Sequence, residues 1–425
     1  NPARIREEDL DDPALADIMV ASAIGRFAVA FDNPFIPRTA NLSDEALTGL
    51  ASEPYRRVNN RVVPYGEAPT RAIFTELHAA RATSEIAVRG LRKMVENPGS
   101  DPRLATALAF AGYSYILLGD ALCESPIDAG AEIYTPLDLY GFAIDHLTEA
   151  LTIAQKAGDN TVIDLARVGL ARAHLNRGEK QQVMQYARDV SPDFVYWAEF
   201  HETDPRIPNA LEAAVNGVNH TIGVHPRFLN GTWLDTVPNE AQTDPRIQHM
   251  PYWRTGADGI TPLYTPYQSL PYSEFSGKTL AEGGVPGTDI LLYQLGTDIK
   301  VASYVEAMHH YYEAAGPDGT GPEGTTLEWV NKRRAFGKQP PVNLSGDELM
   351  SELREQRARD LFLGGFRLGD LRRYERQGIN DPRHQFPTGP HPVSHRGEYG
   401  TDTCFPIPLA EYVGNKHLKN PYLDP

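Results

Sequence analysis

Amphipathic stripes that end at glycine or proline constrain this chain more than any other feature of its sequence. Between Thr70 and Glu96 the apolar residues recur at steps of three, four and seven, which places them on one helix face. Asn97-Pro98-Gly99 then ends the pattern. Further stripes run over residues 104–119, 143–154, 160–178 (with Asn160 as the expected N-cap) and 183–190. We therefore expect a mainly α-helical chain.

The helices are expected to pack as antiparallel pairs. Small residues stand where two helices would approach closely, and glycine stands at the turns. The segment Ala171–Gly178, followed by Ala187, is similar to a tetratricopeptide repeat. The repeats are degenerate because the segment from Cys123 to Leu137 is inserted between the two helices of one pair. We predict a helical scaffold over 67–195.

The helical pattern returns in the C-terminal half and extends the predicted scaffold over 298–376. Val301, Val305 and Met308 renew the stripe. Ser345-Gly346-Asp347-Glu348 has the pattern of a capping box, and it precedes a helix expected to carry Leu349, Leu353, Leu361 and Phe362. Residues 377–425 are rich in Pro and His and are expected to form an irregular tail.

Composition excludes several classes of protein. The chain has 425 residues, enough to bury a large core, and its net charge of −16 opposes binding to a phosphate backbone, so we expect no nucleic-acid partner. No uninterrupted run of about 18 apolar residues occurs, so we expect no transmembrane helix. Two cysteines, Cys123 and Cys404, are too few for a structural zinc site, which needs about four ligands. A disulfide between them and two buried free thiols both remain open.

Regular periodicity fades between residues 196 and 290, where Pro, Gly, Asn and aromatic residues accumulate. Long irregular stretches in a compact chain are usually functional, and Trp and Tyr rings suit stacking on sugars or contacts with proteins. We therefore predict a variable, loop-rich ligand region. Its candidate binding residues are Trp197, Trp233, Tyr252, Trp253, Arg254, Tyr264 and Tyr267, with Asn230 and Asn239 as hydrogen-bonding neighbours. The alternative is that these rings fill the core beneath the loops.

Three clusters contain residues typical of a chemical site but lack the surrounding sequence pattern that such a site requires. Gly319–Gly324 spells G-x-G-x-x-G but follows a helix and contains Pro and Glu, which favours a flexible helix–helix loop over a dinucleotide site. His309, His310 and Glu313 could face one metal, but without an H-E-x-x-H pattern a helix surface is favoured. The arginines over 354–376 alternate with acids, which favours a salt-bridged surface. We expect no catalytic residues, no metal and no cofactor.

Four segments in a fixed order resemble a known family. The longest, Leu353 to Tyr374, fits the form E-R-x-x-E-L-x-x-E-G-x-R-x-x-D-L-x-R at Arg357, Leu361, Gly365, Arg367, Asp370, Leu371 and Arg373, and departs from it at Asp360 and Gly364. The others are Asp244-Pro245-Arg246-Ile247, Leu327 to Ala335, and a terminal "PIP…E…NP" pattern from Cys404 to Glu411 with Asn415 and Asn420-Pro421. Together they resemble the SusD/RagB family of nutrient-binding outer-membrane lipoproteins.

The resemblance implies one SusD-like domain over 1–425 that binds nutrients and does not catalyse a reaction. Such a protein lies on the extracellular face of the outer membrane and delivers a glycan or peptide to a TonB-dependent barrel of the SusC type. The family's lipid-bearing cysteine stands near the mature N-terminus, so we expect the lipid anchor upstream of Asn1. The rival hypothesis is a tetratricopeptide-like interaction protein that self-assembles into extracellular or surface arrays.

Overall fold

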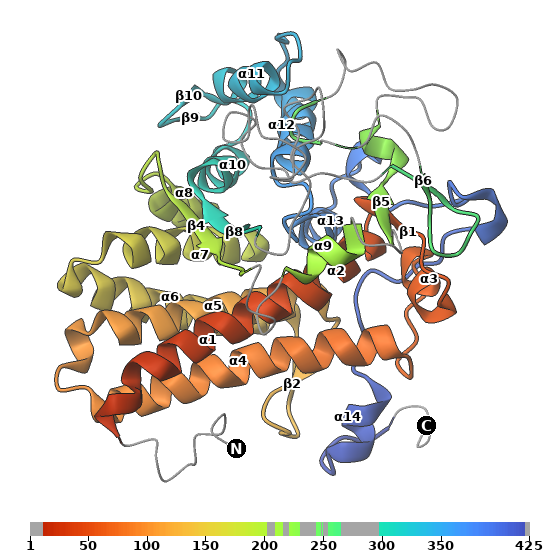
Figure 1. Cartoon of the computed structure of the whole chain (residues 1–425). Coiled ribbons are helices and arrows are strands. Elements are labelled where there is room, and N and C mark those ends of the chain that lie inside the picture. The colour runs from red at the N-terminus through yellow and green to blue at the C-terminus, as the bar shows by residue number, and fades with distance from the viewer. Residues whose placement is uncertain are drawn as a thin grey trace.

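Long antiparallel helices form one layer of the molecule, and the later helices pack above it (Figure 1). The computed structural model describes residues 12–201, 209–215, 221–229, 244–247, 249, 254–264 and 297–420. The long layer consists of α1 (Ala16–Ala30), α4 (Ala68–Met94), α5 (Pro102–Ala121), α6 (Pro136–Ala157), α7 (Asn160–Arg177) and α8 (Lys180–Ala187). Above it lie α10 (Tyr304–Ala315), α11 (Thr326–Phe336), α12 (Gly346–Asp360) and α13 (Arg367–Arg376). The prediction of a mainly α-helical fold is confirmed.

Local sequence signals set most of the helix ends. Gly158 and Gly178 follow α6 and α7 with φ of 72° and 80°, a backbone conformation that favours glycine. Two N-cap predictions need correction. Asp159, rather than Asn160, caps α7 by accepting from the Val162 N–H. Ser345 stands at the start of α12 as predicted, but its side chain makes no capping hydrogen bond.

Helix α5 is the centre of the core. It packs against α1, α4, α6 and α7, and nearly all of its residues are buried. Close approach to α6 depends on glycine: a Cβ atom at Gly112 would lie 2.5 Å from Leu147 Cγ and 3.1 Å from the Ala143 carbonyl oxygen. The small residues that indicated helix pairing in the sequence therefore lie at the helix–helix contacts themselves.

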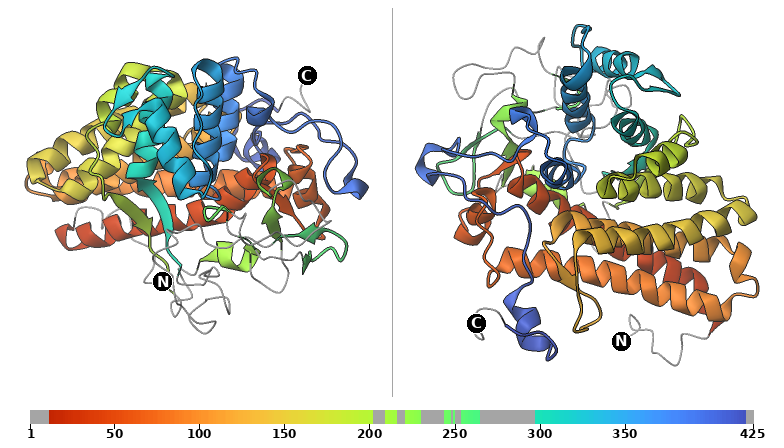
Figure 2. Two further views of the ribbon diagram at one scale, coloured as in Figure 1. Left: turned by 90° about the horizontal axis from the view of Figure 1, so that it is seen from above. Right: turned by 180° about the vertical axis from the view of Figure 1, so that it is seen from behind.

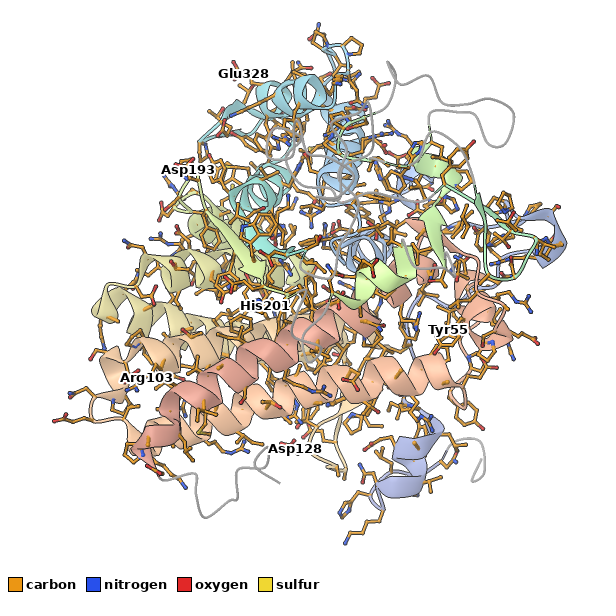
Figure 3. The ribbon with its side chains drawn as sticks, viewed as in Figure 1. Tyr55, Arg103, Asp128, Asp193, His201 and Glu328 are labelled. Carbon is orange, nitrogen blue, oxygen red and sulfur yellow. A yellow bond between two sulfur atoms is a disulfide. The ribbon has the colours of Figure 1, made fainter. Side chains whose placement is uncertain are left out.

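The N-terminal segment belongs to the scaffold, which we had predicted to start only at residue 67. Helix α1 packs along α4 and α5, and Phe27 meets Phe110 edge to face at 5.1 Å. Arg103, labelled in Figure 3, stands at the start of α5 and donates to Asp17 of α1 at 3.3 Å. Apolar spacing does not indicate α1, because the apolar residues of this helix lie on all of its sides instead of on one face.

Among the described residues, two segments are long and apolar enough, by length and composition alone, to cross a membrane. Pro102–Ala121 is α5, and 94% of its apolar window is buried inside the protein, so core packing explains its composition. Pro13–Leu42, near the N-terminus, combines α1, η3 (Phe31–Phe35) and α2 (Ile36–Leu42), and the backbone leaves helical geometry at Asn33. Ser, Gly and charged residues interrupt both segments, so neither is an uninterrupted apolar run.

A long segment, which we call the excursion, separates α8 from α10 in the chain. These two helices pack together, and a two-stranded antiparallel ribbon closes the excursion beside them, with β4 (Val195–Ala198) paired to β8 (Ile299–Ser303). The described parts of the excursion include α9 (Ala210–Val215), β5 (Ile222–Val224), β6 (Arg254–Thr255) and β7 (Pro262–Leu263). Strand β5 pairs with β1 (Ala46–Thr48), so the excursion also contacts the N-terminal segment beside α3 (Glu53–Asn59).

Short hairpins connect other helices. The insertion between α5 and α6 contains β2 (Ser125–Pro126) and β3 (Ile133–Tyr134). The G-x-G-x-x-G segment forms β9 (Thr320–Gly321) and β10 (Gly324–Thr325) between α10 and α11. It is thus a helix–helix connection, as predicted, but a paired hairpin instead of a flexible loop.

The C-terminal tail is fastened to the scaffold at several points. Cys404 forms a disulfide with Cys123 at the end of α5, and Phe405 exchanges backbone hydrogen bonds with Ala121 and Cys123. The short helix α14 (Leu409–Gly414) lies below α4, away from α10–α13, as the view from behind in Figure 2 shows. Asn415 then donates to the Gly130 carbonyl in the β2–β3 turn at 2.9 Å.

Candidate functional site

A cavity of about 190 Å³ lies where the β4–β8 ribbon meets the turn between α12 and α13. Five parts of the chain supply its walls. The walls include Trp197 and Lys300 from the ribbon, Glu306 from α10, Arg333 and Phe336 from α11, Arg246 from the 244–247 segment, and Asp360 to Gly364 with Phe366 at the end of α12.

Aromatic rings backed by cations form part of the wall. Trp197 is half-buried, and the Lys300 ammonium lies 5.9 Å from its ring centroid across the ribbon. The Arg333 guanidinium lies 4.6 Å from the centroid of Phe336, a ring that is 43% exposed. Such rings offer flat apolar surface to a ligand while the cations hold them in place.

A buried ion cluster forms the polar base of the cavity. Asp360 accepts from His309 Nε2 at 2.7 Å, from Arg333 Nη2 at 2.7 Å and from Arg246 Nη1 at 3.2 Å. Burial alone would raise the pKa of Asp360, but the two guanidinium groups and the histidine hold that pKa well below its usual range. The carboxylate is therefore charged and fully engaged, which suits positioning of the wall better than proton transfer.

His309, His310 and Glu313 lie in the core instead of on a helix surface, which corrects the sequence interpretation. His310 Nε2 lies 2.9 Å from Glu306, and burial together with Arg357 lowers the pKa of His310 to about 4. Glu313 pairs with Arg373 of α13. Among the residues that the structure describes, no group of three or more His, Cys, Asp or Glu could hold a metal ion.

The arginine-rich segment is likewise a buried network instead of a salt-bridged surface. Arg357 binds Asp370 through two hydrogen bonds of 2.7 and 2.9 Å, and Arg373 joins the same carboxylate at 2.8 Å. Arg367 reaches Asp44 in the N-terminal segment. Arg357 thus links α12 to α13, and Arg367 links α13 to the N-terminal segment. Within α12, Glu355 and Arg359 form the i,i+4 pair that the sequence suggested, at 2.8 Å.

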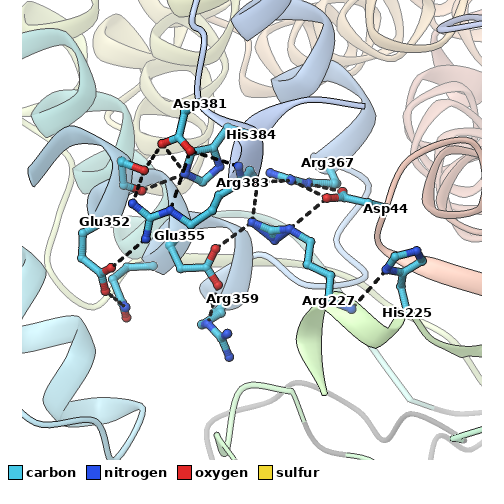
Figure 4. A network of polar contacts seen from close by, with 12 residues as sticks. Asp44, His225, Arg227, Glu352, Glu355, Arg359, Arg367, Asp381, Arg383 and His384 are labelled. Atoms are coloured by element: carbon cyan, nitrogen blue, oxygen red, sulfur yellow. Dashed lines mark hydrogen bonds and ion pairs between the residues drawn. The ribbon is translucent and has the colours of Figure 1, made fainter. Parts of the chain in front are cut away.

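Figure 4 shows how this network joins three segments next to the cavity. Asp44 accepts from Arg367 at 2.7 Å and from Arg227 at 2.9 Å, and Arg227 also reaches Glu355 at 2.7 Å. Burial raises the pKa of Asp44, but Arg367 and Arg227 outweigh that effect and lower it. The neighbouring Glu45 accepts the Leu363 N–H at 2.8 Å and so holds the turn that lines the cavity.

The residues that the sequence predicted to bind ligand lie in different environments or outside the described residues. Trp197 lines the cavity. Tyr264 is only 2% exposed and packs edge to face against His249 at 5.4 Å, so it is a core residue, as the alternative interpretation held. Arg254 begins β6, and its side chain lies outside the described part of the structure. Trp233, Tyr252, Trp253, Tyr267, Asn230 and Asn239 lie outside the described residues.

Sequence reasoning missed Lys300, Phe336, Arg333 and Arg246 as wall residues, although a signal was present. The Asp244–Ile247 segment supplies Arg246, the Leu327–Ala335 segment supplies Arg333, and the Leu353–Tyr374 segment supplies Asp360. These three residues form one ion cluster. Segments that recur together in a sequence pattern can thus mark a shared contact even when each looks unremarkable alone.

Comparison with solved structures places this arrangement among known folds. The structure is similar over 98% of its length to a SusD superfamily protein from Parabacteroides distasonis, with 99% of that chain covered, a TM-score of 0.66 and 16% identity. The chain has the SusD-superfamily fold. A SusD-like carbohydrate-binding protein from Bacteroides fragilis matches the SusD fold of this chain over 96% of its length and 99% of its own, with a TM-score of 0.66 and 13% identity.

A SusD-like carbohydrate-binding protein from Bacteroides vulgatus matches 96% of this chain and 97% of its own length, with a TM-score of 0.65 and 14% identity. No family profile and no curated protein matches the sequence. The SusD fold is therefore recognised here through the arrangement of the helices, at sequence identities too low for the alignment to assign residues.

Proposed function

We propose that this protein is a cell-surface nutrient-binding subunit that takes up a glycan or peptide at the Trp197 cavity and delivers it to a TonB-dependent barrel of the SusC type. The observation that carries the proposal is the likeness over nearly the whole chain to solved structures described as SusD-like carbohydrate-binding proteins. The fully paired carboxylates beside the cavity support binding without catalysis. The same proposal places the protein on the extracellular face of the outer membrane, held by a lipid on a cysteine encoded upstream of Asn1.

Substitution of Trp197 tests the binding site. Glycan and peptide arrays would first select a ligand, and calorimetry would then compare the unchanged protein with Trp197→Ala. Loss of a stacking ring should weaken binding by about tenfold or more, since such a contact contributes roughly 1–3 kcal/mol at a binding hot spot. Tyr186→Ala is the matched control, because Tyr186 is also a half-buried aromatic residue but stacks on His174 away from the cavity. Equal affinity for both variants would contradict the assignment of the site.

Delivery and anchoring have separate tests. Co-purification of the native protein from outer membranes should bring down a large barrel protein, and lipid analysis should find an acylated N-terminal cysteine upstream of Asn1. Purified protein that forms filaments and recovers no barrel would instead favour the assembly hypothesis.

A further inference from the structure

A second cavity lies at the opposite end of α13 from the Trp197 cavity. It has a volume of about 390 Å³, is partly open to solvent, and lies between α13, the segment after it and the C-terminal tail. Its lining residues are Arg61, Leu371, Glu375, Gly378, Ile379, Asn380, His384, Gln385, Phe386 and Thr388, all of which the structure describes. The volume falls in the range of roughly 300–1,000 Å³ that is usual for small-molecule sites, whereas the Trp197 cavity is smaller.

The inner wall of this second cavity is apolar and rigidly held. Leu371 and Phe386 are buried, and the Arg61 guanidinium lies 4.7 Å from the Phe386 ring centroid. Arg61 itself is fixed by hydrogen bonds to the carbonyl oxygens of Pro387 at 2.6 Å and Thr401 at 3.1 Å. The wall is therefore preformed, which lowers the entropic cost of binding.

The rim carries two amide groups, each with one hydrogen-bonding atom that has no protein partner among the described residues. Gln385 Nε2 donates to Asn380 Oδ1 at 2.8 Å, which fixes the two amides side by side. In the described residues, Asn380 Nδ2 and Gln385 Oε1 make no further hydrogen bond, and both side chains are exposed. A donor and an acceptor at neighbouring positions match two adjacent hydroxyl groups, one accepting and the other donating.

A buried nitrogen in the wall also lacks a partner. His384 Nε2 lies 2.8 Å from the Ser351 carbonyl, so it carries the proton and leaves Nδ1 as an acceptor, and that atom has no hydrogen-bond partner. Burial together with Arg367 and Arg227 lowers the pKa of His384 to about 4, so the ring is neutral at neutral pH. A hydroxyl group or a water molecule at this atom would supply the missing donor.

The charges around the cavity balance. Arg61 contributes one positive charge and Glu375 one negative charge, while the remaining polar groups are neutral amides, a hydroxyl and the imidazole. A carboxylate ligand would meet Glu375, and an ammonium ligand would meet Arg61. The wall thus favours an uncharged ligand that has both hydroxyl groups and an apolar face.

From these observations we propose that the cavity beside Asn380, Gln385 and Phe386 is a second binding site that takes a neutral sugar residue. It lies at the far end of α13 from the Trp197 cavity, so it is distinct from the site of the proposed function and its occupancy does not depend on that site. Two sites on one rigid scaffold would allow one polysaccharide chain, or two, to be held at once.

Saturation-transfer NMR with the full-length protein tests the second site. The probes are the methyl glycosides of glucose, galactose, mannose and N-acetylglucosamine, with glucuronic acid and glucosamine as charged counterparts. Trp197→Ala provides the background in which the first cavity is weakened. The test variant is Asn380→Ala/Gln385→Ala, and the matched control is Gln181→Ala/Gln182→Ala, an exposed amide pair on α8.

In the Trp197→Ala background we expect at least one neutral glycoside to bind, the control pair to leave its affinity unchanged, and the test pair to weaken it by about tenfold or more. All variants should melt at the same temperature because the substituted amides are exposed. The proposal is overturned by absence of binding to every neutral probe, by equal affinity in the test and control pairs, or by equal binding of the charged probes. If the neutral glycosides bind the unchanged protein and Trp197→Ala with equal affinity, that result would refute the Trp197 cavity as a sugar site and would leave the second site in place.

Discussion

At the scale of single residues, the protonation state of a buried carboxyl group depends on whether a guanidinium group pairs with it. Burial raises the pKa of Asp32 to about 7, of Glu45 to about 8 and of Asp120 to about 6. Asp360 and Asp44 are buried as well, yet arginines lower their pKa. Hydrogen bonds from N–H and hydroxyl donors lower the pKa of Asp32, Glu45 and Asp120 by less than burial raises it, whereas close arginine pairing outweighs burial and keeps a carboxylate ionised.

Glu45 offers a direct test of this difference. Its folded-state pKa of about 8 lies above the ordinary value of 4.5, so between these pH values the folded protein binds more protons than the unfolded chain and loses stability as pH rises. Glu45→Gln keeps an acceptor for the Leu363 N–H and cannot ionise. The variant should therefore gain melting temperature relative to the unchanged protein as pH rises from about 5.5 to about 8.5.

Thermal unfolding at several pH values would measure this gain. Glu124→Gln, at an exposed position, serves as the control. Parallel pH profiles for Glu45→Gln and the unchanged protein would show that Glu45 is ionised in the folded state throughout, against the prediction.

At the scale of elements, the distance between helices is set by single small residues. Gly112 of α5 faces Leu147 and Ala143 of α6 so closely that an added Cβ has no room. Gly141 of α6 differs, because an added Cβ there would meet only Arg177 Nη1 at an ordinary 3.5 Å. The two positions share a helical backbone and differ in packing alone.

Alanine substitutions should therefore change stability in opposite directions. Gly112→Ala should destabilise the protein by about 1–3 kcal/mol through overpacking, which exceeds the gain in helix propensity. Gly141→Ala should stabilise it by up to ~1 kcal/mol, since only the propensity term remains. Denaturant unfolding measures both values, and a shift of the same sign in the two variants would argue against close α5–α6 packing.

At the scale of the whole molecule, the C-terminal tail closes the fold by binding back to its first third. The disulfide joins positions separated by 281 residues, and Leu122 forms a β-bridge with Phe405 next to it. Arg61 holds a second stretch of the tail through carbonyl oxygens. A cross-link over so long a loop restricts the unfolded chain strongly.

Removal of the cross-link should therefore cost stability without changing the helical scaffold. Cys123→Ala/Cys404→Ala is expected to lower the free energy of unfolding by ~2–5 kcal/mol. Hydrogen exchange should increase in residues 403–409 while α5 stays protected. Mass spectrometry without reductant should find the linked peptides in the unchanged protein; two free thiols there, or equal stability of the variant, would contradict this role.

The sequence by itself was sufficient for the helices α4 to α7 of the scaffold, because the signals involved are local. Apolar spacing indicated α4 to α7, and Gly178 marked the end of α7 by a backbone conformation that glycine favours. The start of the excursion after α8 was also visible, since periodicity fades within a few residues of β4. Each of these features depends on residues that are close together in the chain.

Only the tertiary structure decided where the charged residues and the cavities lie. His309, Arg357 and Asp360 have the pattern of a solvated helix, yet their side chains are buried because partners such as Arg246 and Asp370 reach them from other segments. The Trp197 cavity likewise exists only because β4 pairs with β8 across the excursion. Burial of a charge is favourable only when a distant group compensates it, and periodicity along the chain carries no information about which distant group that is.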